Sequence, residues 1–265
     1  MKVIKGLLCV AMGCMMSCSN ILEEEALVAT NQKGELSLSL GQDEEIQVST
    51  KAVKEVSDNY LVKITGTEAK ELTYADLKNK AISLKVGNYT LTAQNKAESE
   101  VKDFEWNAPF YKGELPSISI EANKETTVEL TCTRANSTIV VDTTAFGAVQ
   151  QEKVVYVQSL TAKCEETGTQ IDLLKKNEQP ASPSDEVCVK AGIKVQIVMI
   201  PVRMSDGVAL APITTDLVSG QGATVAKKKY AVKYSLSTGN GGGKFTIKVD
   251  NGVESVEVPM EVNPY

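Results

Sequence analysis

The aromatic stretch FEWNAPFYKGE, residues 104–114, holds the side chains best suited to contact a ligand. It contains the only tryptophan of the chain, Trp106, together with Phe110 and Tyr111, in a sequence with few aromatic residues. Aromatic faces on a surface loop can stack on sugar rings or anchor a protein interface. The alternative is that the three rings cap the end of a sandwich core. Exposure of Trp106 distinguishes the two interpretations, because a buried ring is not available to a sugar.

Few residues of the chain are candidates for catalysis. The chain has no histidine, which excludes Ser-His-Asp and Cys-His catalysis and histidine-ligated zinc. The run GNGGGKF at residues 239–245 has the wrong spacing for a phosphate-binding loop, and Phe245 stands where Ser or Thr would hold magnesium. Carboxylates that converge from distant positions, as in glycoside hydrolases, are the enzymatic alternative, but no pair is indicated. We therefore predict no enzymatic activity, no catalytic residue, no metal and no cofactor.

The N-terminus carries the residues of a lipidation signal. Lys2 and Lys5 precede the apolar run GLLCVAMGCMM, which is too short to span a bilayer. Cys14 and Cys18 each follow a small residue, an arrangement that resembles the bacterial lipobox. In that signal, signal peptidase II cuts before the cysteine and the thiol receives a diacylglycerol. Cleavage before Cys18 leaves a full apolar segment behind, so Cys18 is the predicted lipidated residue and Cys14 the alternative.

Two N-terminal segments follow from this interpretation. Residues 1–17 are predicted to be a lipoprotein signal peptide and residues 18–33 a polar tether, with an ordinary secretory peptide as the alternative. Removal of residues 1–17 leaves 26 basic and 34 acidic side chains, a net charge of −8. This charge argues against nucleic acid and anionic lipid as partners. The palmitate-type lipid would be the only membrane anchor, since no later segment is long and apolar enough to span a bilayer.

Beyond the tether, the hydrophobic pattern has a period of two. The segments GELSLSL, ISLKV and IKVQIVM alternate apolar and polar residues, which is typical of strands with one buried face. Their apolar positions are Leu36, Leu38 and Leu40, then Ile82, Leu84 and Val86, then Ile193, Val195, Ile197 and Met199. Many such strands with turn residues between them predict an all-β fold of antiparallel sandwiches.

Two local motifs refine this prediction. The segment TYADLKN predicts one short connecting helix, with Thr73 as its cap and Asp76 three residues later. Asn251 and Gly252 predict a two-residue hairpin turn that would place Ile247 opposite Val256, and likewise Phe245 opposite Val258.

The cysteines and a change of strand set bear on domain organisation. Cys132 falls on the apolar phase of TTVELTC and is predicted to be a buried small hydrophobe. Cys164 and Cys188 either pair across the polar segment between them or are isolated strand cysteines.

A boundary near residues 135–150 divides the chain into two β-sandwich domains, residues 34–140 and residues 141–265.

Several short motifs in order resemble the fimbrillin-like surface lipoproteins of the Bacteroides group, and within it an uncharacterised lipoprotein family. They are the lipobox at Cys18, GELSLSL, VSTKAV, TYADL, VGNYTLTAQN, APFYKGE and TTVELTCTRANSTIVVD. The resemblance covers mainly residues 34–142 and implies two tandem transthyretin-like sandwiches with a role in cell adhesion or fimbrium assembly. Glu23, Glu24 and Glu25 resemble an acidic export signal of this group, which implies a lipid anchor in the outer membrane facing the cell exterior.

The resemblance also implies a processing site. In polymerising members of the group, a protease cuts after a basic residue and releases the first strand, and the next subunit's strand fills the groove. Here Lys33 or Lys51 would be that residue, whereas a protein that keeps its first strand would be an anchor, a tip or a stand-alone surface protein.

The sequence therefore predicts a lipid-anchored, non-enzymatic surface protein in adhesion or fimbria-related assembly. Its expected partners are other fimbrial subunits or surface glycans of host or bacterial cells. The alternative is a glycan-binding surface lipoprotein that uses the aromatic stretch 104–114.

Overall fold

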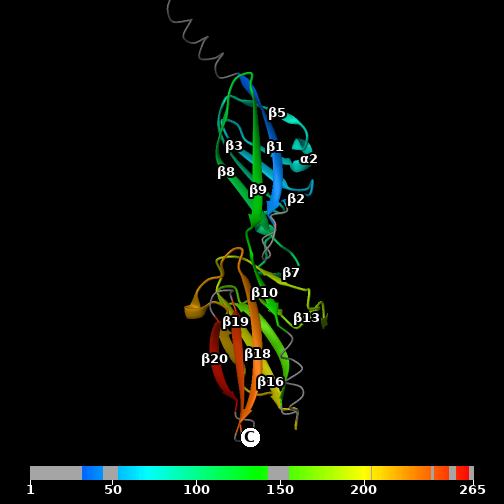
Figure 1. The fold of residues 1–265 in the computed structure, drawn as a ribbon, viewed down its shortest axis with the longest axis vertical. Helices are drawn as coiled ribbons and strands as arrows, with labels where there is room; N and C mark the ends of the chain where they lie inside the picture. Colours follow the sequence, from blue (N-terminus) through cyan, green and yellow to red (C-terminus); the bar gives the residue numbers. More distant parts are fainter. Residues whose placement is uncertain are drawn as a thin grey trace, which may run out of the picture.

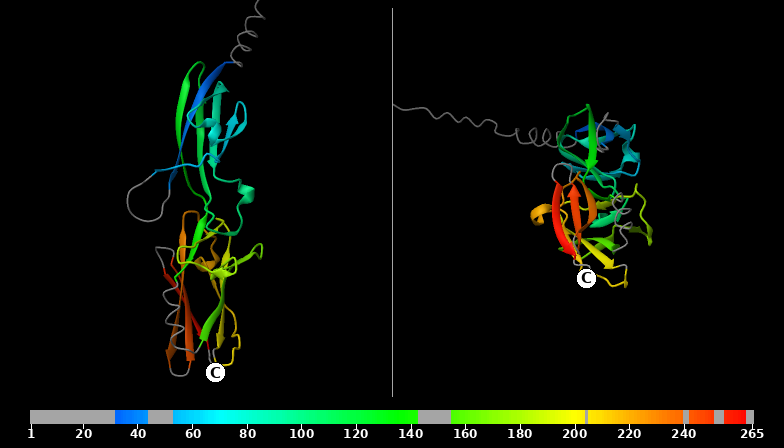
Figure 2. Two further views of the ribbon diagram at one scale, coloured as in Figure 1. Left: turned by 90° about the vertical axis from the view of Figure 1, so that its right-hand side faces the viewer. Right: turned by 60° about the horizontal axis from the view of Figure 1, so that its bottom comes forward.

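The computed structural model describes residues 32–43, 53–142, 155–203, 205–239, 242–250 and 255–262. Almost every regular element in these ranges is a strand, so the predicted all-β sandwich fold is confirmed. The strands form two groups stacked end to end along the long axis, the upper sandwich and the lower sandwich (Figure 1 and Figure 2). Of the predicted N-terminal sites, Cys18 and Lys51 lie outside the described residues.

The upper sandwich is an eight-stranded sheet that bends into two layers around a core. One layer holds β1 (Lys33–Asp43), β2 (Val53–Glu55), β5 (Ala81–Lys85) and β9 (Glu125–Arg134). The other layer holds β3 (Leu61–Gly66), β4 (Lys70–Thr73), β6 (Gly87–Gln94) and β8 (Tyr111–Ile120). The bend lies between β8 and β9, whose pairing is confined to Tyr111 with Arg134 and Lys112 with Thr133.

The first strand, β1, is an interior strand of its layer. It pairs in parallel with β9 along one edge and antiparallel with β5 and β2 along the other. The alternation predicted from GELSLSL is confirmed, since Leu36, Leu38 and Leu40 are buried in the upper core. The parallel direction of β1 and β9 differs from an all-antiparallel sandwich. Alternation shows which face of a strand is buried but carries no information on the direction of its neighbour.

A short helix connects two strands, as predicted, and these strands, β4 and β5, belong to different layers. Helix α2 (Tyr74–Leu77) follows β4 directly, and Tyr74 and Leu77 are buried. The Thr73 N–H donates to Asp76 Oδ2 at 3.0 Å, and the Thr73 hydroxyl donates to the same oxygen at 2.7 Å. These bonds hold the pKa of Asp76 below its usual value. Among the described residues, the helices are all too short or too polar to span a membrane.

The lower sandwich packs a six-stranded sheet on a four-stranded sheet. The six strands are β7 (Phe104–Trp106), β10 (Ser137–Val141), β15 (Val187–Val189), β18 (Lys229–Gly239), β19 (Gly242–Asp250) and β20 (Ser255–Val262). The four strands are β11 (Val155–Cys164), β12 (Gln170–Asp172), β16 (Val195–Arg203) and β17 (Ile213–Asp216). The remaining elements are the hairpin of β13 (Lys175–Lys176) and β14 (Gln179–Pro180) and the turns η1 (Glu98–Glu100) and η3 (Ser219–Gln221).

The alternation of apolar residues also identifies side chains of the lower core. Val195, Ile197 and Met199 of β16 are buried, and Ile193 packs against them from outside the strand. The pairing of β10 with β18 is parallel, the second such pair. The two predicted domains, 34–140 and 141–265, stay a prediction; β7 and most of β10 precede residue 141 in the chain but pair within the lower sandwich.

The hairpin register predicted near the C-terminus is wrong by two residues. Ile247 pairs with Val258 rather than with Val256, and Phe245 pairs with Met260. The connection between the strands therefore holds four residues rather than two, and it lies outside the described residues. A shift of two residues preserves the alternation of a strand, so the apolar pattern alone cannot set this register.

The cysteines of the described residues are all free and buried, so the disulfide alternative is wrong. Cys164 lies at the end of β11 and Cys188 in β15, which belong to different sheets. Cys132 is fully buried in the upper core, as predicted, and burial raises the pKa of its thiol to about 11.

Candidate binding site at Trp106

Residues 95–110 leave the upper sandwich after β6, cross to the lower one, and return as β8; we call them the strap. Its strand β7 pairs antiparallel with β15, so Trp106 lies beside Val187. The turn after β7 is made by Asn107, whose φ of 49° falls in the left-handed region that asparagine tolerates better than most residues. The aromatic stretch found in the sequence is thus part of the link between the two sandwiches.

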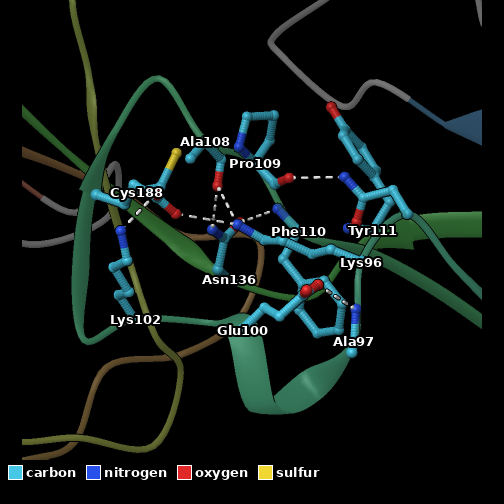
Figure 3. Close-up of polar contacts among 12 residues, drawn as sticks. Lys96, Ala97, Glu100, Lys102, Ala108, Pro109, Phe110, Tyr111, Asn136 and Cys188 are labelled. Atoms are coloured by element: carbon cyan, nitrogen blue, oxygen red, sulfur yellow. Dashed lines mark hydrogen bonds and ion pairs between the residues drawn. The ribbon is translucent and has the colours of Figure 1, made fainter.

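Asn136 fixes the return of the strap. Its side chain is 2% exposed, and its Oδ1 accepts hydrogen bonds from the Phe110 N–H at 3.2 Å and from Arg134 Nε at 3.1 Å. Its Nδ2 donates to the Ala108 carbonyl at 3.3 Å (Figure 3). One buried amide therefore bonds two backbone groups of the strap, the Phe110 N–H and the Ala108 carbonyl.

Glu105 braces the strap through two lysines. Lys96 Nζ and Lys102 Nζ each lie 3.2 Å from its carboxylate, and Lys96 also donates to the Ala108 carbonyl at 3.5 Å (Figure 3). Burial would raise the pKa of Glu105, but the hydrogen bonds and charges of the two lysines outweigh it, and the pKa is lowered. The carboxylate therefore stays ionised at neutral pH.

A nearly buried ion pair joins Arg134, the last residue of β9, to Glu186, the residue before β15. Arg134 Nη2 donates to Glu186 Oε1 at 2.6 Å, and the two side chains are 11% and 22% exposed. The same nitrogen lies 3.0 Å from Cys188 Sγ. Because Arg134 ends β9 and Glu186 directly precedes β15, this ion pair links the upper sandwich to the lower one.

The three predicted ligand-contact residues do not form one surface. Trp106 is half-buried and packs against the lower core, whereas Tyr111 is buried in the upper core. Phe110 is also buried, with its backbone bonded to Asn136. Only Trp106 keeps an accessible ring, so it alone can contact a ligand.

Trp106 borders a pocket at the edge of the lower core. The register places Trp106, Val187, Ile139 and Tyr230 in one row across the six-stranded sheet. The last three are buried, and Trp106 ends the row at the sheet edge. Beside it lies a pocket of about 190 Å³ that is mostly apolar and is closed on one side by residues 173–186, which we call the flap.

Asp185 holds the flap in place. Its Oδ1 accepts hydrogen bonds from Asn107 Nδ2 at 2.7 Å and from Lys176 Nζ at 3.1 Å, and its Oδ2 accepts one from the Ser182 N–H at 2.9 Å. The hydrogen bond from Asn107 is the largest cause of a pKa lowered to about 2. The backbones of Asn107 and Glu186 also bond, at 2.9 Å. The Asp185 carboxylate in the pocket wall is therefore ionised, and this wall is hydrogen-bonded to the strap.

Sequence reasoning missed the flap, which lies in the polar segment between Cys164 and Cys188. The signal that could have found it is the pair Leu173 and Leu174 inside a polar segment, since both pack on the lower core. Lys33, the described processing candidate, is exposed at the start of β1. A second, larger hollow of about 620 Å³ lies near Leu61 and Lys112, on the layer of the upper sandwich that holds β3, β4, β6 and β8. Within the described ranges, no group of three or more His, Cys, Asp or Glu side chains is placed to hold a metal ion.

Residues 32–181, more than half of the chain, match the model of a family described as a domain of unknown function (DUF4493). The chain belongs to this family. The DUF4493 match spans the upper sandwich, the strap and the flap as far as Ala181. It therefore includes Trp106 and much of the pocket wall.

Among solved structures, proteins from Parabacteroides and Bacteroides species are similar to this chain. A fimbrial assembly protein from Parabacteroides distasonis is 11% identical, with 86% of this chain and 99% of that chain covered and a TM-score of 0.44. A candidate cell adhesion protein from Bacteroides eggerthii is 11% identical, with 78% and 87% covered and a TM-score of 0.45. Candidate polysaccharide binding proteins from Bacteroides thetaiotaomicron give 9% identity, 82% and 98% coverage and a TM-score of 0.38. No curated protein matches the chain.

Proposed function

We propose that this protein is a lipid-anchored, non-enzymatic cell-surface protein that takes part in adhesion or fimbria-related assembly. The position of β1 is the observation that carries the proposal. The first described strand of the chain is hydrogen-bonded along both edges and buries Leu36, Leu38 and Leu40 in the upper core. A strand next to a chain terminus that completes a core in this way can be replaced by an equivalent strand from another molecule.

Strand replacement would use a groove with defined walls. Without β1, the ladder groups of β9 and β5 that face it would lose their partners, and the core beneath would be open to water. Unpaired strand edges recruit other strands, and the alternating leucines of an incoming copy would supply the missing apolar face.

The two candidate processing residues differ in what a cut would release. A cut after Lys33 leaves β1 in place from Gly34 onward, whereas a cut after Lys51 removes all of β1. Lys51 is therefore the position at which processing would open the groove. Without such a cut, the protein would serve as an anchor, a tip or a stand-alone surface protein.

The geometry also suits attachment through Cys18. β1 begins at the outer end of the upper sandwich, and the lower sandwich lies at the opposite end of the long axis (Figure 1). A lipid on Cys18 in the outer membrane would therefore hold the upper sandwich near the membrane and present the lower sandwich, with the Trp106 pocket, to the exterior.

Strand replacement is tested with two trimmed proteins. A chain starting at Ala52 lacks β1, and a chain starting at Gly34 keeps it and serves as the matched control. We expect the first to form ladders when mixed with full-length mature protein and to be blocked by a peptide of residues 34–43, while the control stays monomeric. A shorter chain that remains monomeric and does not bind the peptide would overturn strand replacement.

Lipid anchoring is tested with the two candidate cysteines. We expect Cys18→Ser to abolish metabolic labelling with a fatty acid and to release the protein from the outer membrane. Cys14→Ser is the matched control and should keep both properties. The reverse pattern would move the anchor to Cys14, and labelling of neither parent nor variant would exclude a lipid anchor.

Glycan binding is the second candidate function. It is favoured by the half-buried ring of Trp106 at a pocket of about 190 Å³. This function needs neither strand replacement nor the lipid.

A further inference from the structure

We propose that the pocket beside Trp106 binds one neutral hexopyranose ring, with the apolar face of the sugar on the indole and its hydroxyl groups toward Asp185 and Ser182. The proposal names the ligand class for the glycan-binding candidate and rests on it. It is independent of strand replacement at β1 and of lipidation at Cys18.

The size of the pocket selects one six-membered ring. Protein interiors are close-packed and contain few voids larger than a water molecule. A cavity of about 150 Å³ accommodates benzene, and the pocket here measures about 190 Å³. Two of the flap residues that line it, Ala181 and Ser182, have small side chains and leave this space unfilled.

The lining has two chemical sides, as a pyranose does. Trp106, Ile139 and Leu173 offer apolar surface, and Asp185 and Ser182 offer polar groups from the flap. A pyranose carries C–H bonds on its faces and hydroxyl groups around its rim. It can therefore cover the indole and place hydroxyl groups against the flap at the same time, which an apolar ring cannot do.

Asp185 has capacity left for a ligand. Its Oδ1 accepts from Asn107 and Lys176, while its Oδ2 accepts one hydrogen bond, from the Ser182 N–H. A carboxylate offers about four acceptor positions, so Oδ2 can accept from a sugar hydroxyl as well. The charge of Lys176 is already engaged by Asp185, and the ionised carboxylate repels acidic sugars. This balance favours a neutral sugar over a uronic acid.

The wall that faces the ligand is already assembled. Asp185 is bonded to the strap through Asn107, and the Ala181 N–H donates to the Leu174 carbonyl at 2.8 Å, which ties the flap to itself. A site that is ordered before binding loses less conformational entropy when the ligand enters. Binding should therefore require no rearrangement of the flap.

The test follows the emission of Trp106, the only tryptophan, in the chain from Ser19 onward, which lacks Cys18 and therefore the proposed lipid. We expect at least one neutral hexose or N-acetylhexosamine in a broad panel to change its emission with saturation at millimolar concentration. Glucuronate and cyclohexanol should give no saturable change. A panel without any saturable response would overturn the proposal, and a response to cyclohexanol equal to that of the best sugar would assign the pocket to apolar rings instead.

Two matched variants locate the response. Ala181→Leu fills the pocket without altering Trp106 and should abolish the sugar response, whereas Ala211→Leu makes the same change at an exposed position away from the pocket lining and should keep it. Thermal unfolding confirms that each variant is folded, and Ser182→Leu replaces Ala181→Leu if that variant is not. Persistence of the response in a folded, pocket-filled variant would refute the site. Ladder formation by the trimmed chain is measured separately, so failure of sugar binding and failure of the assembly role are distinguishable.

Discussion

The two sandwiches complete their cores in opposite ways. The core of the upper sandwich includes β1, the first of the described strands, which supplies three buried leucines. In the lower sandwich, one edge strand of the six-stranded sheet is β7, a short strand of the strap. In the sequence, β7 lies between β6 and β8, two strands of the upper sandwich. Cleavage of the chain after β1 would remove β1 from the upper core. The strand β7 would remain, because β6 precedes it and β8 follows it in the chain.

This difference bears on the proposed strand replacement, which involves the upper sandwich alone. Loss of β1 would open the upper core and leave β7 paired with β15, because the strap runs between β6 and β8 and does not include β1. The lower sandwich would keep Trp106 and its pocket. Under the proposed strand replacement, the upper sandwich would exchange a strand while the Trp106 pocket of the lower sandwich stayed unchanged.

The largest expected effect on stability comes from substitutions that create a cavity in one core or the other. Leu91 in β6 and Ile197 in β16 are fully buried, and replacement of either by Ala should cost about 2–5 kcal/mol. If the sandwiches differ as described, Ile197→Ala lowers the midpoint of the Trp106 fluorescence transition in urea, while Leu91→Ala lowers mainly the midpoint at which the Cys132 thiol becomes reactive.

Leu61→Ala is the control for this pair, since Leu61 is 39% exposed and should change both midpoints little. Equal shifts of both probes by Leu91→Ala would show that the two sandwiches unfold as one unit, contrary to the comparison.

The next largest effect concerns the ion pair that links the sandwiches. Arg134→Met removes the hydrogen bonds to Glu186 and Asn136 and leaves a largely buried carboxylate, which should cost about 1.5–3 kcal/mol. The second variant Glu186→Gln in the same chain should recover part of that loss, because the unpaired charge is gone. Urea unfolding of the two single variants and the double variant measures the coupling; strictly additive losses would argue against a link through this pair.

Much of the local structure could be predicted from the sequence. The alternation of Leu36, Leu38 and Leu40 predicts a buried face because a strand repeats every two residues. Thr73 and Asp76 predict a helix start because a side chain three residues later can reach back to the backbone. Both signals act over a few residues, so the fold has little freedom to override them.

The pairings between distant segments could not be predicted in this way. The parallel partner of β1 and the crossing of β7 depend on the path of the whole chain, which alternation does not encode. The binding site shows the same limit, because composition alone singled out Trp106, whereas Asp185 meets Asn107 across 78 residues of sequence. The separation of Phe110 and Tyr111 from Trp106 likewise results from the strap turning between two cores.

A smaller effect is expected at the buried amide of the strap. Asn136→Ala leaves the Phe110 N–H without its partner and leaves the Ala108 carbonyl with the longer bond from Lys96, and it should cost about 1–2 kcal/mol. Because these groups position the return of the strap, the Trp106 transition in urea should shift along with the Cys132 transition. Asn59→Ala, at an exposed position, is the control and should shift neither. A shift confined to Cys132 would mean that Asn136 serves the upper sandwich alone.

The smallest effect is a difference in acid sensitivity between the sandwiches. Asp76 in the upper sandwich and Asp185 at the flap both have lowered pKa values, the first through Thr73 and the second chiefly through Asn107. A carboxyl whose pKa is lower in the folded state contributes stability above its unfolded value, and this contribution is lost as the pH falls through the folded value. For Asp185 that window runs from the ordinary aspartate pKa of about 3.9 down to about 2.

Within this window, acid should loosen the hold of Asp185 on the flap and change the Trp106 emission before the chain unfolds globally. Asp185→Asn should remove that pH dependence, because an amide does not titrate, while Asp76→Asn should leave it intact and alter only the acid response of the upper sandwich. Emission of Trp106 and the NMR amide signals of the upper sandwich, followed together from pH 5 to about pH 2, separate the two responses. If Asp76→Asn changed the Trp106 response as much as Asp185→Asn did, the two ends of the molecule would be coupled through the strap more tightly than its hydrogen bonds indicate.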